Sequence, residues 1–265
     1  MKGLGIIMLF VITLSGLTHG LESNTIRLTT VFDNTRLNSE TTSEWGFACV
    51  IEHPQETLLF DTGNDGQILQ QNLKVLGFNQ VSFSKIIISH MHWDHYGGLE
   101  TMMDANPNAT VYVPASAKML KDSTVLECCK NLVHVDQPVK IIDHVYSSGE
   151  LDGPVNEQSL VITTSNGLVV VTGCAHPGIV KIAEAARDQF PDVQTIDLLM
   201  GGFHLMRHAE AQVMEIIQEL RVLNVKNVSP THCTGEKAID LFQQQFGDHF
   251  MKPGIGFQVD FSWVD

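Results

Sequence analysis

The stretch SHMHWDHYGG, residues 89–98, constrains this chain more than any other. Three histidines and an aspartate lie within six residues here, directly after the apolar run at residues 86–88: His90, His92, Asp94 and His95. Such an apolar run is typical of a buried strand, along which residues two apart point the same way. We therefore expect His90 and His92 to reach one metal ion together. Asp94 and His95 should face a neighbouring position that a second metal could occupy.

Composition predicts a globular protein with a substantial core. The chain has 265 residues, of which 43% are hydrophobic and 17% are charged. Its formal net charge is −14, from 16 basic and 30 acidic residues. Nucleic acids and anionic membrane surfaces attract basic faces, so this acidic balance argues against both partners. We expect a small-molecule substrate, and the sequence does not indicate an oligomeric state.

The first twenty residues have the pattern of a secretory signal. Lys2 supplies a positive charge, residues 4–17 are almost wholly apolar, and residues 18–20 offer small residues at a cleavage point. This apolar run of roughly 14 residues is shorter than the roughly 20 that span a bilayer, which favours a cleaved signal over an uncleaved anchor. We therefore expect export to the periplasm or the medium, with residues 24–265 forming a single domain.

Two strand pairs with similar layouts organise the rest of the chain. The first pair, residues 45–51 and 56–60, ends in Asp61. This residue is expected either to hydrogen-bond a metal-bound histidine and so orient its ring, or to form a turn. The second pair, residues 159–164 and 168–172, is joined by a hairpin turn. Further strands are expected at residues 25–32, 86–88, 110–113, 195–200, 225–229 and 256–264, and helices at residues 68–76, 179–190, 209–223 and 236–246.

Histidines recur in the loops that follow the later strands. His176, His204 and His232 come after the expected strands at residues 168–172, 195–200 and 225–229. Because α/β folds build their sites at strand ends, we expect these histidines near the first cluster. His134 and His144 are expected at the surface or satisfied in the core. The remaining three are expected to be solvated, with His208 close enough to His204 to line the pocket: His53, His208 and His249.

Five cysteines lie beyond the signal pattern, and an odd number cannot pair completely within one chain. Two of them, Cys174 and Cys233, flank histidines in the later loops. We expect both to be small buried residues, with a thiolate metal ligand or a mutual disulfide as the alternatives.

The HMHWDH cluster and the glycine pair after it resemble the metallo-β-lactamase-fold hydrolase superfamily, as do the upstream LLFDTG and the later histidine loops. The loops TGCAHPGIV, GGFHL and SPTHCTG are most similar to its dihydropterin ribofuranosyl-aminobenzene phosphate synthase-like subfamily. The resemblance covers nearly the whole chain after residue 20. It implies an α/β protein with a four-layer αββα sandwich, built of two similar halves with metals at one edge.

The same resemblance implies which residues bind the metal. It assigns His90, His92 and His176 to one site and Asp94, His95 and His232 to a second, with Asp61 behind them. The cofactor implied is one or two Zn²⁺ ions, with Mn²⁺ or Fe²⁺ as alternatives. Most two-metal members carry a bridging carboxylate where this chain has Gly201 and Gly202. His204 is the nearest substitute, as a metal ligand, a substrate contact or a structural residue.

These assignments predict a metal-dependent hydrolase, in which a metal-bound hydroxide attacks an ester, lactone, amide or phosphoester. Asp94 would hold metal and orient the hydroxide, and His204 would stabilise charge on the substrate oxygen. The alternatives are a mononuclear iron oxygenase on the same fold, using three histidines, and a metal-binding protein without catalysis. The substrate pocket is expected from residues 33–44 and 114–150, and nothing in these segments names a ligand.

Overall fold

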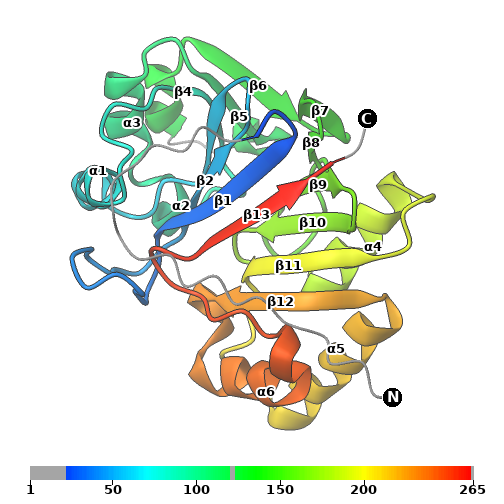
Figure 1. Ribbon diagram of the computed structural model, residues 1–265. Coiled ribbons are helices and arrows are strands. Elements are labelled where there is room, and N and C mark those ends of the chain that lie inside the picture. Colours follow the sequence, from blue (N-terminus) through cyan, green and yellow to red (C-terminus); the bar gives the residue numbers. More distant parts are fainter. Residues whose placement is uncertain (1–21, 120–122, 264–265) are drawn as a thin grey trace.

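In the computed structural model, which describes residues 22–119 and 123–263, the strands form one seven-stranded and one six-stranded sheet. The two sheets pack face to face, and helices cover the outer face of each (Figure 1). The predicted αββα sandwich is therefore confirmed. The expected signal segment, residues 1–20, lies outside the described residues.

The first sheet has the strand order β13-β1-β2-β3-β4-β5-β6. Strands β13 to β3 pair antiparallel, whereas β3 to β6 run parallel, so the carboxyl ends of β3 and β4 lie side by side. Its members are β1 (Thr25–Phe32), β2 (Ala48–Glu52), β3 (Thr57–Phe60), β4 (Phe83–Ile87), β5 (Thr110–Pro114), β6 (Asn131–Val135) and β13 (Gln258–Ser262).

The second sheet has the order β12-β11-β10-β9-β8-β7, and β10, β11 and β12 are parallel. The carboxyl ends of these three strands therefore also meet at one edge. Its members are β7 (Val139–Ile142), β8 (Val145–Ser147), β9 (Leu160–Thr164), β10 (Gly167–Thr172), β11 (Ile196–Gly202) and β12 (Val225–Thr231).

Alternation along the central strands produces three apolar layers. In β3, Leu58 and Phe60 point into the space between the sheets, whereas Leu59 points to the outer helices. In β10, Val171 faces the inner space and Val170 the outer helices. Both faces of these strands are buried, which explains why they read as continuous apolar runs rather than as an alternating pattern.

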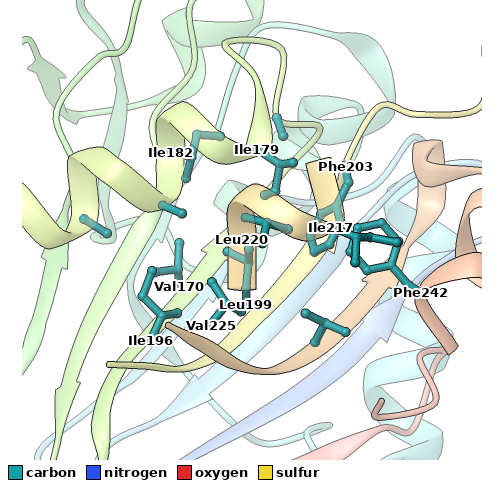
Figure 2. Packing of buried hydrophobic residues seen from close by; sticks show 14 of the residues in the cluster. Val170, Ile179, Ile182, Ile196, Leu199, Phe203, Ile217, Leu220, Val225 and Phe242 are labelled. Carbon is teal, nitrogen blue, oxygen red and sulfur yellow. The ribbon is translucent and has the colours of Figure 1, made fainter. Parts of the chain in front are cut away.

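Three helices cover each sheet. The outer face of the second sheet carries an apolar cluster whose side chains fill the space beneath the helices (Figure 2). On α5, Val213, Ile217 and Leu220 are buried at the spacing of one helical face. The helices of the first sheet are α1 (Gly66–Val75), α2 (Trp93–Tyr96) and α3 (Leu99–Ala105), and those of the second are α4 (Ile179–Gln189), α5 (Glu210–Val222) and α6 (Glu236–Phe246). Within the described residues, none of the helices has the length and apolar character needed to cross a bilayer.

Two parts of the chain differ from the sequence-based expectation. Residues 114–150, which showed no clear pattern, contain β6, β7 and β8 and two short 3₁₀ helices, Ala115–Met119 and Ser123–Cys128. Strands of three to five residues are too short to establish a period. The prediction of a solvated His53 was wrong: this side chain is 6% exposed, and its ring stacks on Trp263 at 5.3 Å.

The apolar cluster between α5 and the second sheet predicts a large loss of stability when a buried side chain of this helix is truncated. Ile217 is fully buried between the helix and the second sheet, so Ile217→Ala should lower the free energy of unfolding by about 2–5 kcal/mol through lost contacts and a residual cavity. Urea unfolding followed by circular dichroism measures this change.

Val222, in the last turn of the same helix, provides a matched control because it is 83% exposed. Val222→Ala should alter the free energy of unfolding by less than about 0.5 kcal/mol. Equal effects of the two substitutions would contradict the packing described here.

Candidate metal centre

Five loops bring the candidate residues together at one edge of the sandwich. They follow β3, β4, β10, β11 and β12, and each leaves the carboxyl end of a strand in a parallel pair. Four non-glycine residues in these loops have positive φ angles: Asp61 (57°), Ala175 (56°), His204 (53°) and His232 (50°). Such left-handed conformations cost energy for residues with side chains and cluster at functional sites.

The first predicted group, His90, His92 and His176, is gathered into one triangle. The ring centroids are 4.7 Å apart for His90 and His92, 4.7 Å for His90 and His176, and 4.8 Å for His92 and His176. His90 Nε2 and His92 Nδ1 face each other at 3.1 Å. His90 is fully buried and His92 is exposed, so the triangle opens to solvent on one side.

The second predicted group, Asp94, His95 and His232, lies directly beside the first. Asp94 Oδ2 is 3.2 Å from His232 Nε2 and 3.7 Å from His95 Nε2. The rings of His95 and His90 are 4.2 Å apart, so the two groups adjoin each other. All six residues that the resemblance assigned as ligands therefore meet at this edge.

The carboxylate of Asp61 connects the two groups from behind. It accepts hydrogen bonds from the Ser89 backbone N–H at 2.6 Å and the Ser89 hydroxyl at 2.7 Å, and His95 Nδ1 lies 2.7 Å away. The Ser89 oxygen in turn lies 2.9 Å from His90 Nδ1. Metal binding through Nε2 requires the proton on Nδ1, and in both rings an acceptor oxygen lies beside that atom. Ser89 was not singled out from the sequence, although it directly precedes His90.

Burial and neighbouring charges shift the pKa values of these side chains, and the net shift is upward for some residues and downward for others. Burial lowers the pKa of His95, but the Asp61 carboxylate outweighs it and raises that pKa to about 9. Burial and the neighbouring rings of His204 and His92 lower the pKa of His176 to about 3. Burial raises the pKa of Asp94, but His232 and His95 hold it below its usual range. Asp94 therefore stays ionised although imidazole rings surround it.

A divalent cation fits the donor set. The Nε2 atoms of His176 and His232 are buried, and among the described residues neither has a hydrogen-bond partner. His232 Nδ1 is engaged by Asn34 Oδ1 at 2.9 Å, which leaves the Nε2 lone pair directed toward Asp94. Buried polar atoms without partners are costly, and imidazole nitrogens with one carboxylate oxygen are the ligands that Zn²⁺-type ions take.

A second buried carboxylate holds the loop that carries His176. Glu157, 1% exposed, accepts hydrogen bonds from four consecutive backbone N–H groups, residues 173–176, at 2.9 to 3.0 Å. It also accepts one from the Thr172 hydroxyl at 2.9 Å. Glu157 was missed from the sequence, because a single acid in an irregular segment carries no local signal.

His204 lies beside the first group rather than between the two groups. Its ring is 4.3 Å from that of His176, its side chain is exposed, and hydrogen bonding with Cys233 raises its pKa. Cys174, His204 and Cys233 each offer an atom within 4.8 Å of the others. Cys174 and Cys233 are buried, as expected, and all five cysteines are unpaired.

A cavity of about 770 Å³ opens beside His232. Asn34, Thr35 and Trp45 line one side of it, and the start of α6 and the loop before α5 line the other. The Trp45 ring is 4.7 Å from that of His232. Of the two segments expected to build the substrate pocket, residues 33–44 contribute Asn34 and Thr35 to this cavity, whereas residues 114–150 do not line it.

The Glu157 carboxylate predicts a loss of both stability and metal affinity in Glu157→Gln. The amide NH₂ would face backbone N–H groups and leave at least one buried donor without an acceptor, at a cost of about 1–3 kcal/mol. Metal affinity should fall about 10- to 100-fold, because the loop that positions His176 loosens. Urea unfolding and competition with a chelating dye measure the two effects.

Glu219→Gln, on the exposed face of α5, serves as the matched control and should leave both quantities unchanged. Wild-type stability and metal affinity in Glu157→Gln would show that this carboxylate does not hold the loop.

Known proteins are similar to this chain in sequence and in fold. The 7,8-dihydropterin-6-methyl-4-(β-D-ribofuranosyl)-aminobenzene-5′-phosphate synthase of Methanocaldococcus jannaschii is 26% identical over 272 residues, covering 84% of this chain and 92% of that protein. A crystal structure of a metal-dependent hydrolase of the β-lactamase superfamily matches with a TM-score of 0.75 at 26% identity, covering 89% of this chain and 99% of that one.

A second solved structure supports the fold alone. The metallo-β-lactamase fold protein YhfI of Bacillus subtilis has a TM-score of 0.60 at 16% identity, covering 89% of this chain and 99% of its own. The family model described as the metallo-beta-lactamase superfamily matches residues 46–232, from just before β2 to the last histidine of the site. The resemblance predicted from the histidine loops is therefore confirmed, and the chain belongs to the metallo-β-lactamase superfamily.

Proposed function

We propose that this protein is a metal-dependent hydrolase acting on an ester, lactone, amide or phosphoester of a small molecule. One observation carries the proposal: two groups of three potential ligands, His90, His92 and His176 beside Asp94, His95 and His232, adjoin each other, and His232 also lines a cavity. Six ligands with an open side exceed what a structural metal site requires, which supports catalysis over simple metal storage.

The residues around the site have distinct roles in this proposal. When bound, a Zn²⁺-type ion lowers the pKa of its water to about 7 and so supplies hydroxide at neutral pH. Asp61 keeps the His90 and His95 rings oriented, and the ionised Asp94 accepts a hydrogen bond that orients the attacking water. His204, whose pKa is raised, donates a hydrogen bond to the substrate oxygen on which charge develops.

Two other reactions remain as alternatives. The name of the Methanocaldococcus relative is that of a synthase, so group transfer to an acceptor other than water is the first. A mononuclear iron oxygenase using His90, His92 and His176 is the second. Product analysis separates transfer from hydrolysis, and iron-selective loading with oxygen consumption would favour the oxygenase. Two equivalents of zinc per chain would count against it.

The first test removes single ligands. His92→Ala and His176→Ala should each bind less metal and lose activity by about 100-fold or more, since each deletes one of three ligands from the first group. Metal content of purified protein, measured by mass spectrometry, and turnover of a panel of esters and phosphodiesters provide the readouts.

His249→Ala is the control, because this exposed histidine contacts Asn227 far from the site and should retain metal and turnover. Full activity in metal-free His92→Ala or His176→Ala would overturn the proposal.

The cavity beside His232 predicts where the substrate binds. Trp45 is 42% exposed at its rim, and the nearby Met206 is 55% exposed, so the site suits a substrate with an apolar or aromatic part. Trp45→Ala should raise KM about tenfold, which corresponds to about 1.4 kcal/mol of binding energy. Steady-state kinetics measure the change.

Leu37→Ala is a matched control from the same segment, because Leu37 is 43% exposed and does not line the cavity. An unchanged KM in Trp45→Ala would place the substrate elsewhere.

A further inference from the structure

The place where a bridging carboxylate was expected has no room for a side chain. A Cβ atom on Gly202 would lie 2.5 Å from the carbonyl oxygen of Gly173 and 2.7 Å from Cys233 Sγ. The Gly202 backbone N–H donates a hydrogen bond to the same carbonyl oxygen at 3.0 Å, so β11 runs close to the loop after β10. Close packing at Gly202 therefore excludes the carboxylate side chain that was expected there.

A different side chain lies between the two ligand groups. Cys174 offers its sulfur within 4.8 Å of ligand atoms of Asp94, His95 and His232, which are themselves mutually within this distance. The same sulfur satisfies the same limit with His90 and His176. Among the described residues, Cys174 is the one member shared by a cluster from each ligand group.

The closest approach is to the second group. Cys174 Sγ is 3.2 Å from His95 Nε2, the atom whose lone pair Asp61 directs into the site. Two ligands of a tetrahedral zinc, at about 2.3 Å for sulfur and about 2.0 Å for nitrogen, are separated by about 3.5 Å. The observed separation is near this value. The neighbouring His232, 4% exposed, directs an Nε2 atom without a hydrogen-bond partner at the same space.

Hydrogen bonds hold the loop around Cys174 in a defined conformation. Cys174 is 3% exposed, and its backbone N–H is one of the four that donate to Glu157. Ala175 follows in a left-handed conformation, with φ of 56°, between Cys174 and His176. This one loop thus positions both Cys174 and His176 next to the ligand groups.

We propose that Cys174 binds metal through its sulfur and is the ligand shared by the two metal positions, in place of the missing carboxylate. This inference rests on the metal centre proposed above and adds a seventh ligand to it. Like the expected carboxylate, a thiolate contributes one negative charge between two cations.

The charge balance of this step is simple. On metal binding the Cys174 S–H bond breaks, its proton passes to solvent, and the electron pair left on sulfur binds the cation. A divalent cation that binds a thiol displaces its proton, so the cation takes the place of the proton on sulfur. No oxidant or reductant is required.

Cys233 is the alternative sulfur, and its position is less suitable. It shares a metal-sized cluster with Cys174 and His204, and among the described residues it joins no such cluster with the six predicted ligands. Its Sγ instead contacts the Cys174 carbonyl oxygen at 3.6 Å. Soft thiolate ligation by Cys174 would also favour zinc or cobalt over magnesium or manganese.

Cobalt substitution tests the proposal without reference to activity. Metal-depleted full-length protein is titrated with Co²⁺, and absorbance is followed in the near ultraviolet, where thiolate-to-cobalt charge transfer absorbs and imidazole and carboxylate complexes do not. Wild-type protein should show this band. Cys174→Ala and Cys174→Ser should both lose it, and their second equivalent of Co²⁺ should bind at least about tenfold more weakly.

Two further variants make the result specific. Cys233→Ala should retain the band, as should Cys49→Ala, which alters a buried cysteine between the strands of the first sheet. Survival of the band in folded Cys174→Ala or Cys174→Ser, or its absence from cobalt-loaded wild-type protein, would overturn the proposal. Failure of wild-type protein to bind any metal would instead refute the hydrolase itself, and metal binding without turnover would leave the thiolate assignment standing.

Discussion

The buried carboxylate of Asp61 is the interaction on which the site depends. It is fully buried, and an isolated carboxylate in such a place is costly unless hydrogen bonds compensate it. The Ser89 backbone, the Ser89 hydroxyl and the His95 ring provide that compensation. Ser89 lies in the loop after β4 and His95 in α2 directly after that loop, so the hydrogen bonds that stabilise the charge also orient His90 and His95.

The second sheet uses the same physical device. Glu157 is 1% exposed and is compensated by the backbone of residues 173–176. Asp61 orients imidazole rings directly, whereas Glu157 orients a loop, and through it His176 and Cys174. Two buried acids thus hold the two halves of the centre, one from each sheet. For His90, His95 and His232, the second ring nitrogen lies beside an acceptor, so the Nε2 atoms are left to bind metal.

The glycine pair at the end of β11 links this packing to the proposed chemistry. Close approach of β11 to the loop after β10 excludes a side chain at Gly202, and the Cys174 sulfur lies near ligand atoms of both groups. The departure from the superfamily pattern at Gly201 and Gly202 therefore coincides with a candidate replacement ligand. The cavity beside His232 and the exposed ring of Trp45 then define the approach to that position.

Local patterns in the sequence predicted most strands and helices, though not β6 to β8, because hydrophobic period is a property of neighbouring residues. Histidine spacing indicated the cluster at residues 90–95, and the family resemblance supplied the full set of six candidate ligands. Helix α6 and strand β1 have the predicted ends. Only the tertiary structure decided which distant residues meet. Glu157 lies 15 to 19 residues from its partners, Cys174 lies 79 from His95, and His232 lies 198 from Asn34. Those contacts arise from parallel strand register and from the packing of one sheet on the other, which no short stretch of sequence encodes.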